Sequence, residues 1–102
     1  MGFDAIDMTA GGGAQTVTVP AATNGYVVKA IAGRLCTVLV TANMATTALT
    51  FYDNNAAASG TIIGVIPATA TAGSVYNFKI PAQNGIYAVG GTGQTACTVA
   101  FN

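Results

Sequence analysis

The sequence contains no histidine, tryptophan or glutamate, and only 6% of its residues are charged. An ordinary soluble domain carries about 25% charged residues. General acid–base catalysis depends mainly on histidine and on paired carboxylic acids. This chain of 102 residues offers three aspartates as its only side-chain acids and no histidine to activate a thiol or hydroxyl nucleophile. We therefore expect a protein that is not an enzyme.

The few charges also exclude several classes of partner. Three basic residues balance the three acids, and Lys29, Arg34 and Lys79 are scattered along the chain. Nucleic acids and anionic membrane surfaces need clustered lysine and arginine, so we expect neither as a partner. A surface with so little charge is poorly protected against association, and a chain of this length has a modest core. Both points predict a homo-oligomer, with a trimer expected.

Two motifs look like ligand sites but lack essential parts. Asp53, Asn54 and Asn55 begin like a calcium-binding loop, yet no later glutamate completes it. The glycine-rich residues 91–96 loosely match a dinucleotide fingerprint, but the β-branched residues after them predict a strand where that motif requires a helix. We expect a turn at Asp53, no metal and no cofactor.

The two cysteines, Cys36 and Cys97, lie far apart, each inside a predicted strand. Free cysteine usually behaves as a small buried hydrophobic residue. We expect both thiols to be reduced and buried, with a disulfide as the alternative.

Neither a targeting signal nor a membrane span is predicted. Asp4 and Asp7 occupy the region where a signal peptide would be basic. The most apolar window, 26–44, is interrupted by Lys29 and Arg34 and is rich in β-branched residues. We expect a protein made in a cytoplasm.

Strand signals recur at short spacing, whereas no segment shows the periodicity of a helix. The expected strands are 15–19, 26–32, 34–42, 49–52, 61–66, 74–80, 86–89 and 95–101. Residues 15–102 are expected to form one domain. Residues 1–14 combine Phe3, Ile6 and Met8 with three consecutive glycines, which predicts a flexible arm that docks on a neighbouring subunit, or otherwise a frayed terminus.

Two segments carry apolar residues on both faces. In 34–42, strict alternation places Cys36, Val38 and Val40 on one face and Leu35 and Leu39 on the other. Because both of its faces are apolar, 34–42 is expected to be central or at an interface. The second strand of the hairpin 49–66 also has apolar side chains on both faces, so one face can fill a core and the other needs cover from a neighbour. The residues expected at an interface are Phe3, Ile6, Met8, Leu35, Leu39, Tyr52 and Ile63.

Similar corners recur along the chain, each with a strand end, a Pro-Ala pair and a returning strand. They begin at Pro20, Pro67 and Pro81. Equivalent corners are typical of two packed sheets. The sequence therefore predicts an all-β fold, an antiparallel β-sandwich of jelly-roll type with about eight strands.

Several segments together resemble small all-β structural proteins from the virions of tailed bacteriophages. They are Leu49-Thr50-Phe51-Tyr52-Asp53-Asn54, Ser59-Gly60-Thr61-Ile62-Ile63, Ile66-Pro67-Ala68, residues 78–86 and Thr98-Val99. The resemblance spans most of residues 15–102. It implies a capsid cement or decoration subunit that bridges capsomers on the head surface, with the major capsid protein as partner and no catalytic residue. The alternative is a tail or spike component that binds a host-surface glycan.

Overall fold

The computed structural model describes residues 15–102, which form eight β-strands and no helix. The strands are β1 (Gln15–Val19), β2 (Tyr26–Lys29), β3 (Gly33–Val40), β4 (Leu49–Tyr52), β5 (Ile62–Ile66), β6 (Val75–Ala82), β7 (Ile86–Val89) and β8 (Cys97–Phe101). The expected all-β fold with eight strands is confirmed. Within residues 15–102, no helix is long and apolar enough to cross a membrane.

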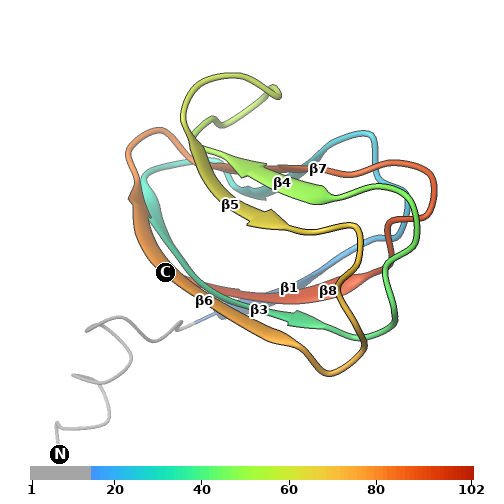
Figure 1. Cartoon of the computed structure of the whole chain (residues 1–102). Coiled ribbons are helices and arrows are strands. Elements are labelled where there is room, and N and C mark those ends of the chain that lie inside the picture. Colours follow the sequence, from blue (N-terminus) through green and yellow to red (C-terminus); the bar gives the residue numbers. More distant parts are fainter. Residues whose placement is uncertain (1–14) are drawn as a thin grey trace, which may run out of the picture.

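The strands form two antiparallel sheets of four strands each, stacked as two layers (Figure 1). The order is β1-β8-β3-β6 in the first sheet and β2-β7-β4-β5 in the second. This β-sandwich arises because each strand directs alternate apolar side chains toward the opposite sheet. As expected from its apolar character, β3 is a central strand.

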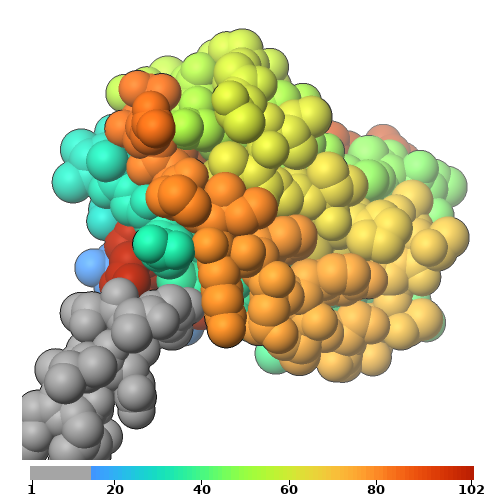
Figure 2. All heavy atoms as spheres, turned by 60° about the vertical axis from the view of Figure 1, so that its left-hand side comes forward, coloured from blue at the N-terminus to red at the C-terminus, as the bar shows by residue number. Residues whose placement is uncertain are grey.

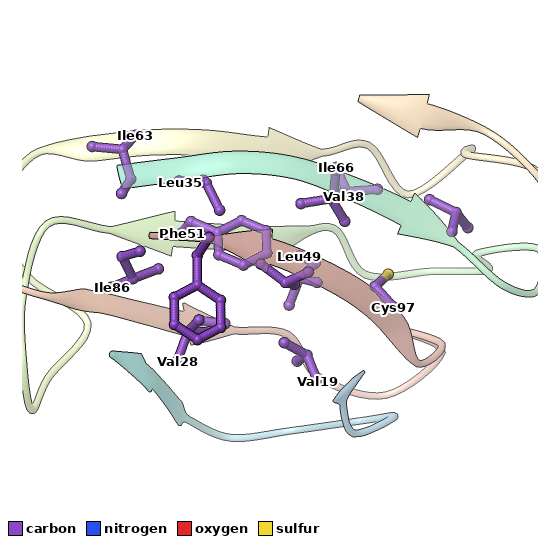
Figure 3. Packing of buried hydrophobic residues seen from close by; sticks show 14 of the residues in the cluster. Val19, Val28, Leu35, Val38, Leu49, Phe51, Ile63, Ile66, Ile86 and Cys97 are labelled. Atoms are coloured by element: carbon purple, nitrogen blue, oxygen red, sulfur yellow. The ribbon is translucent and has the colours of Figure 1, made fainter. Parts of the chain in front are cut away.

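One hydrophobic core fills the space between the sheets (Figure 3). Phe51 of β4 is fully buried at its centre, and its ring centroid lies 6.4 Å from that of Phe78 on β6. Phe78 in turn stacks on Tyr76. β5 lies beside β6 along this side of the molecule (Figure 2). A Cβ on Gly64 of β5 would lie only 3.1 Å from the side chains of Leu35 and Phe78, so any larger residue there would require these two side chains to shift by a few tenths of an ångström.

The expected division of β3 into two faces is wrong at its first half. The pairing of β3 with β8 shifts register between Leu35 and Thr37, so one extra residue of β3 is accommodated there. A β-bulge of this kind changes the side to which the next side chains point. Leu35, Cys36, Val38 and Val40 are therefore all fully buried, and Leu39 is the one apolar side chain of β3 that faces outward.

A second bulge changes the faces of β5. The register against β4 shifts where Tyr52 pairs with Ile62. Ile63 and Ile66 point into the core, whereas Ile62 and Val65 are exposed. The interface prediction is thus corrected for Leu35 and Ile63: both are core residues, because each lies at a register shift that the alternating pattern does not reveal.

The expected bounds differ most at β2 and β6. β2 ends at Lys29 and not at residue 32, since Ile31 is in a bend and 67% exposed. β6 continues through Pro81 to Ala82, beyond the expected end at residue 80. Because β6 is an edge strand, the missing N–H of the proline breaks no required pairing.

Candidate functional site

The outer face of the second sheet carries an apolar row that crosses all four strands. Val27 of β2 pairs with Tyr87 of β7, Tyr87 with Tyr52 of β4, and Tyr52 with Ile62 of β5. Paired residues on one face of a sheet place their Cβ atoms about 5 Å apart, so the four side chains form a continuous row. Val27 is 42% and Ile62 54% exposed.

A second, parallel row lies on three of these strands, β4, β5 and β7. Thr50 of β4 pairs with Val89 of β7 on one side and with Val65 of β5 on the other. Thr50 and Val89 are half-buried, and Val65 is exposed. The two rows together are here called the apolar face: Val27, Thr50, Tyr52, Ile62, Val65, Tyr87 and Val89.

The apolar face contains no ionisable group other than its two tyrosines. Among residues 15–102, the charged residues next to it in the sequence are Lys29 and Asp53, and both lie outside the two rows. Lys29 follows the bulge of β2 and pairs with Ile86 outside both rows. Asp53 directly follows β4, and its carboxylate is occupied by backbone donors of another loop. A partner that covers this face would therefore desolvate no carboxylate or ammonium group.

Asp53 joins the loop after β4 to the turn between β6 and β7. Its Oδ2 accepts a hydrogen bond from the Gln83 N–H at 3.0 Å, and its Oδ1 accepts one from the Asn84 N–H at 2.8 Å. These donors, Gln83 first, hold the pKa of the Asp53 carboxyl below its ordinary value. The Asp53 side chain therefore connects two distant segments, whereas the turn expected at this position is made by the neighbouring Asn54, and the contact fixes the end of the strand that carries Tyr52.

The loop that begins with Asp53 is ordered by its own side chains. The Asn54 Oδ1 accepts hydrogen bonds from the N–H groups of Ala56 and Ala57, and the Asn54 amide donates to Ser59. This is an Asx-type turn, in which a side chain replaces a missing backbone partner. The loop rises beyond the end of β4 and β5 in Figure 1.

We expect Asp53→Asn to destabilise the protein in a pH-dependent way. The depressed pKa means that the carboxylate stabilises the fold above its unfolded value of 3.8, and that this contribution is lost as the pH falls through the lower folded pKa. The melting temperatures of the wild type and of Asp53→Asn should thus differ at pH 7 and converge in strong acid. A difference that is the same at pH 7 and at pH 2 would contradict this role.

The residues predicted for an interface fall into four groups. Tyr52 lies in the apolar face. Leu39 is 38% exposed on the outer face of the first sheet, beside Val75 of β6. Leu35 and Ile63 are in the core, as corrected above. The last group, Phe3, Ile6 and Met8 of the expected arm 1–14, lies outside the described residues.

Six of the seven residues of the apolar face were missed by sequence reasoning: Val27, Thr50, Ile62, Val65, Tyr87 and Val89. The outward direction of Tyr52 follows from its alternation with the buried Leu49 and Phe51. The identity of its neighbours depends on strand pairing between distant segments. No local pattern contains that information.

Both cysteines are free and fully buried, as the sequence predicts. Burial raises the pKa of the Cys97 thiol to about 11. Burial also raises the pKa of Cys36, partly offset by the positive charges of Arg34 and Lys79. Both thiols are therefore protonated at neutral pH, and the thiolate is the reactive form.

Across residues 15–102 the structure contains neither a pocket nor a cluster of three potential metal ligands. Comparison with protein-family models, with curated proteins and with solved structures finds no match to this chain.

Proposed function

We propose that this chain is a non-enzymatic structural subunit of a bacteriophage virion, a capsid cement or decoration protein that stabilises the head shell by bridging capsomers. The observation that carries the proposal is the apolar face, which is continuous over four strands and free of carboxylate and ammonium groups. Exposed apolar patches rimmed by polar residues mark interaction sites on soluble proteins. The resemblance to virion proteins supplies the partner, the major capsid protein.

The strand order supports a finer description of the fold. The pairs β1–β8, β2–β7, β3–β6 and β4–β5 are nested, as if one long hairpin had been rolled into two sheets. We infer a jelly roll, an architecture that occurs in viral capsid and lectin domains. The proposed location is the outer surface of the capsid, after synthesis in the host cytoplasm.

The energetics of such an attachment follow from burial. Fully burying an exposed valine or isoleucine stabilises by about 1.5–3 kcal/mol, so covering three half-exposed ones contributes about 2–4 kcal/mol. They are Val27, Ile62 and Val65. Each subunit that binds only the assembled shell stabilises it by mass action. With no carboxylate or ammonium group in the face, binding should depend weakly on salt, unlike an electrostatic contact screened over about 10 Å at 0.1 M.

One observation favours the alternative function, a tail or spike component that binds a host glycan. Tyr52 and Tyr87 are directly paired on the apolar face, so their side chains are neighbours. Tyrosine offers an apolar ring with a polar tip, which suits a surface that is partly wet. The following experiment distinguishes this function from the proposed one.

The experiment adds purified protein to phage heads that lack it and measures bound copies and the temperature of genome release. We expect the wild type to bind and to raise the release temperature, equally at low and high salt. Ile62→Lys places a charge in the apolar face and should weaken binding at least about tenfold, equivalent to 1.4 kcal/mol. Ile31→Lys is the matched control, because Ile31 is exposed in the bend after β2 and outside the face.

Two results would oppose the proposal. If Ile62→Lys bound as tightly as Ile31→Lys, the apolar face would not be part of the contact with the head. Heads of unchanged stability with and without the protein, together with poor adsorption of phage that lack it, would favour the glycan-binding function.

A further inference from the structure

The two open sheets leave four edge strands: β1 and β6 in the first sheet, β2 and β5 in the second. An edge strand presents unpaired N–H and C=O groups and is a template for another strand. Proteins block such edges with bulges, prolines, charged side chains or a covering segment. The four edges of this fold differ sharply in how far they are blocked.

Three of the edges are interrupted. β2 shifts register against β7 between Val27 and Lys29. β5 shifts register against β4 and lies beside β6. β6 shifts register against β3, contains Lys79 with a φ of 56°, and includes Pro81. Each of these features breaks the regular spacing of backbone groups that an incoming strand would need.

Within residues 15–102, the β1 edge has no such device. Its five residues pair with β8 in one unbroken register, from Gln15 with Phe101 to Val19 with Cys97. The strand contains no charged residue, no proline and no residue with positive φ. Thr16 and Thr18 are exposed, and Val17 is only half-buried against the core.

The backbone groups at this edge can be assigned from the far end of β8. Asn102 and Arg34 exchange two hydrogen bonds, of 3.1 and 3.0 Å, so the backbone groups of Asn102 face β3. Successive residues of a strand direct these groups to opposite sides. Phe101, Val99 and Cys97 therefore face β1, and they bond to the odd-numbered residues opposite them. The N–H and C=O groups of Thr16 and Thr18 point away from β8, and among residues 15–102 none bonds to them.

We propose that β1 pairs with β1 of a second copy of this chain, antiparallel and across a two-fold axis at Val17. In this register Thr16 lies opposite Thr18 of the partner subunit, and Thr18 opposite Thr16 of the partner subunit. Each pair exchanges two hydrogen bonds, so all four outward backbone groups of each chain are satisfied. The two first sheets join into one sheet of eight strands.

The side chains fit the same register. Val17 meets Val17 of the partner subunit as a non-hydrogen-bonded pair, in which the Cα atoms approach to about 4.5 Å. The part of each Val17 side chain that is exposed in the single chain is thereby covered by the partner subunit. The threonines form cross-strand pairs on the outer face, which stabilise antiparallel strands. The uncharged strand brings no like charges together, and the resulting dimer differs from the trimer expected from the sequence.

Proline at Thr18 tests the backbone contact. Thr18→Pro removes an outward N–H and places a ring in the path of the partner strand, while the hydrogen bonds to β8 remain. Thr18→Val is the matched control, because it changes the side chain and keeps the N–H. Sedimentation of the full chain is measured at a protein concentration of about 0.1 mM, which is high enough to populate a weak dimer. The wild type and Thr18→Val should sediment as dimers. Thr18→Pro should be monomeric with an unchanged circular dichroism spectrum.

A cysteine at the axis tests the register. Val17→Cys should form a disulfide-linked dimer under mild oxidation, since its Cα separation suits a disulfide. The buried native thiols should not react. Val65→Cys on the apolar face is the matched control and should remain mostly monomeric.

Three outcomes would overturn the proposal. One is a wild-type chain that stays monomeric at about 0.1 mM, because even a weak dimer with a dissociation constant of that order would be populated there. Another is faster cross-linking of Val65→Cys than of Val17→Cys, which would indicate association through the apolar face. The third is a dimer that appears only after residues 1–14 are deleted, which would show that this segment of the same chain covers the β1 edge.

Discussion

Replacing Phe51 with alanine is expected to lower the free energy of unfolding by about 3–5 kcal/mol. The Phe51 side chain is fully buried between the sheets, with its ring against Phe78. The substitution removes the ring and leaves a cavity that the strands around it cannot close. A small domain has a total stability of about 5–15 kcal/mol, so this single change removes a large part of it.

Urea denaturation of both proteins measures the effect. Thr50→Ala is the control, because Thr50 is the neighbour on β4 and points to the outer face; it should change the stability by about 0.5 kcal/mol or less. Equal losses for the two variants would mean that β4 does not direct Phe51 inward, and the division of the second sheet into a core face and an apolar face would be wrong.

A second large loss of stability is expected when Gln94 is replaced. Its side chain is 2% exposed, and its amide oxygen and nitrogen are both hydrogen-bonded. Its Oε1 accepts from the Thr23 N–H at 2.9 Å, and its Nε2 donates to the Pro20 carbonyl at 3.1 Å. The loop before β8 is thereby tied to the corner between β1 and β2. Leucine has nearly the same volume, so Gln94→Leu removes the hydrogen bonds and leaves little cavity.

We expect Gln94→Leu to cost about 2–4 kcal/mol, because the buried Thr23 N–H and the partly buried Pro20 carbonyl lose their partners. The melting temperature should fall by at least roughly 8 °C. Gly90→Ala provides an independent check: a Cβ there would overlap the Gln94 side-chain amide, so it must displace the same side chain. Melting temperatures within about 2 °C of the wild type for both variants would contradict this role.

The strand count and the all-β class could be predicted because they rest on local signals. Alternation of Leu49 and Phe51 with Thr50 and Tyr52 fixes which side chains of β4 enter the core, whatever the partner strand is. The turn that follows β4 was likewise predictable, since Asn54 bonds to the nearby N–H groups of Ala56 and Ala57. The bonds of Asp53 to Gln83 and Asn84 were not predictable, because they join segments far apart in the sequence.

The faces of β3 and β5 could not be predicted in the same way. A bulge depends on pairing with a strand far away in sequence, so the pattern around Leu35 or Ile63 gives no sign of it. For the same reason the apolar face could not be assembled from the sequence. Val27 and Tyr87 become neighbours only through the pairing of β2 with β7. The identity of the open edge at β1 also depends on the complete strand order.

The most direct test of the proposed function is a cryo-electron microscopy map of the intact phage particle at a resolution that places side chains. The proposal predicts density for this β-sandwich on the outside of the head, across joints between copies of the major capsid protein, with Val27, Tyr52 and Ile62 against the shell. A head surface without this protein, or a bound subunit whose apolar face points to solvent, would contradict it.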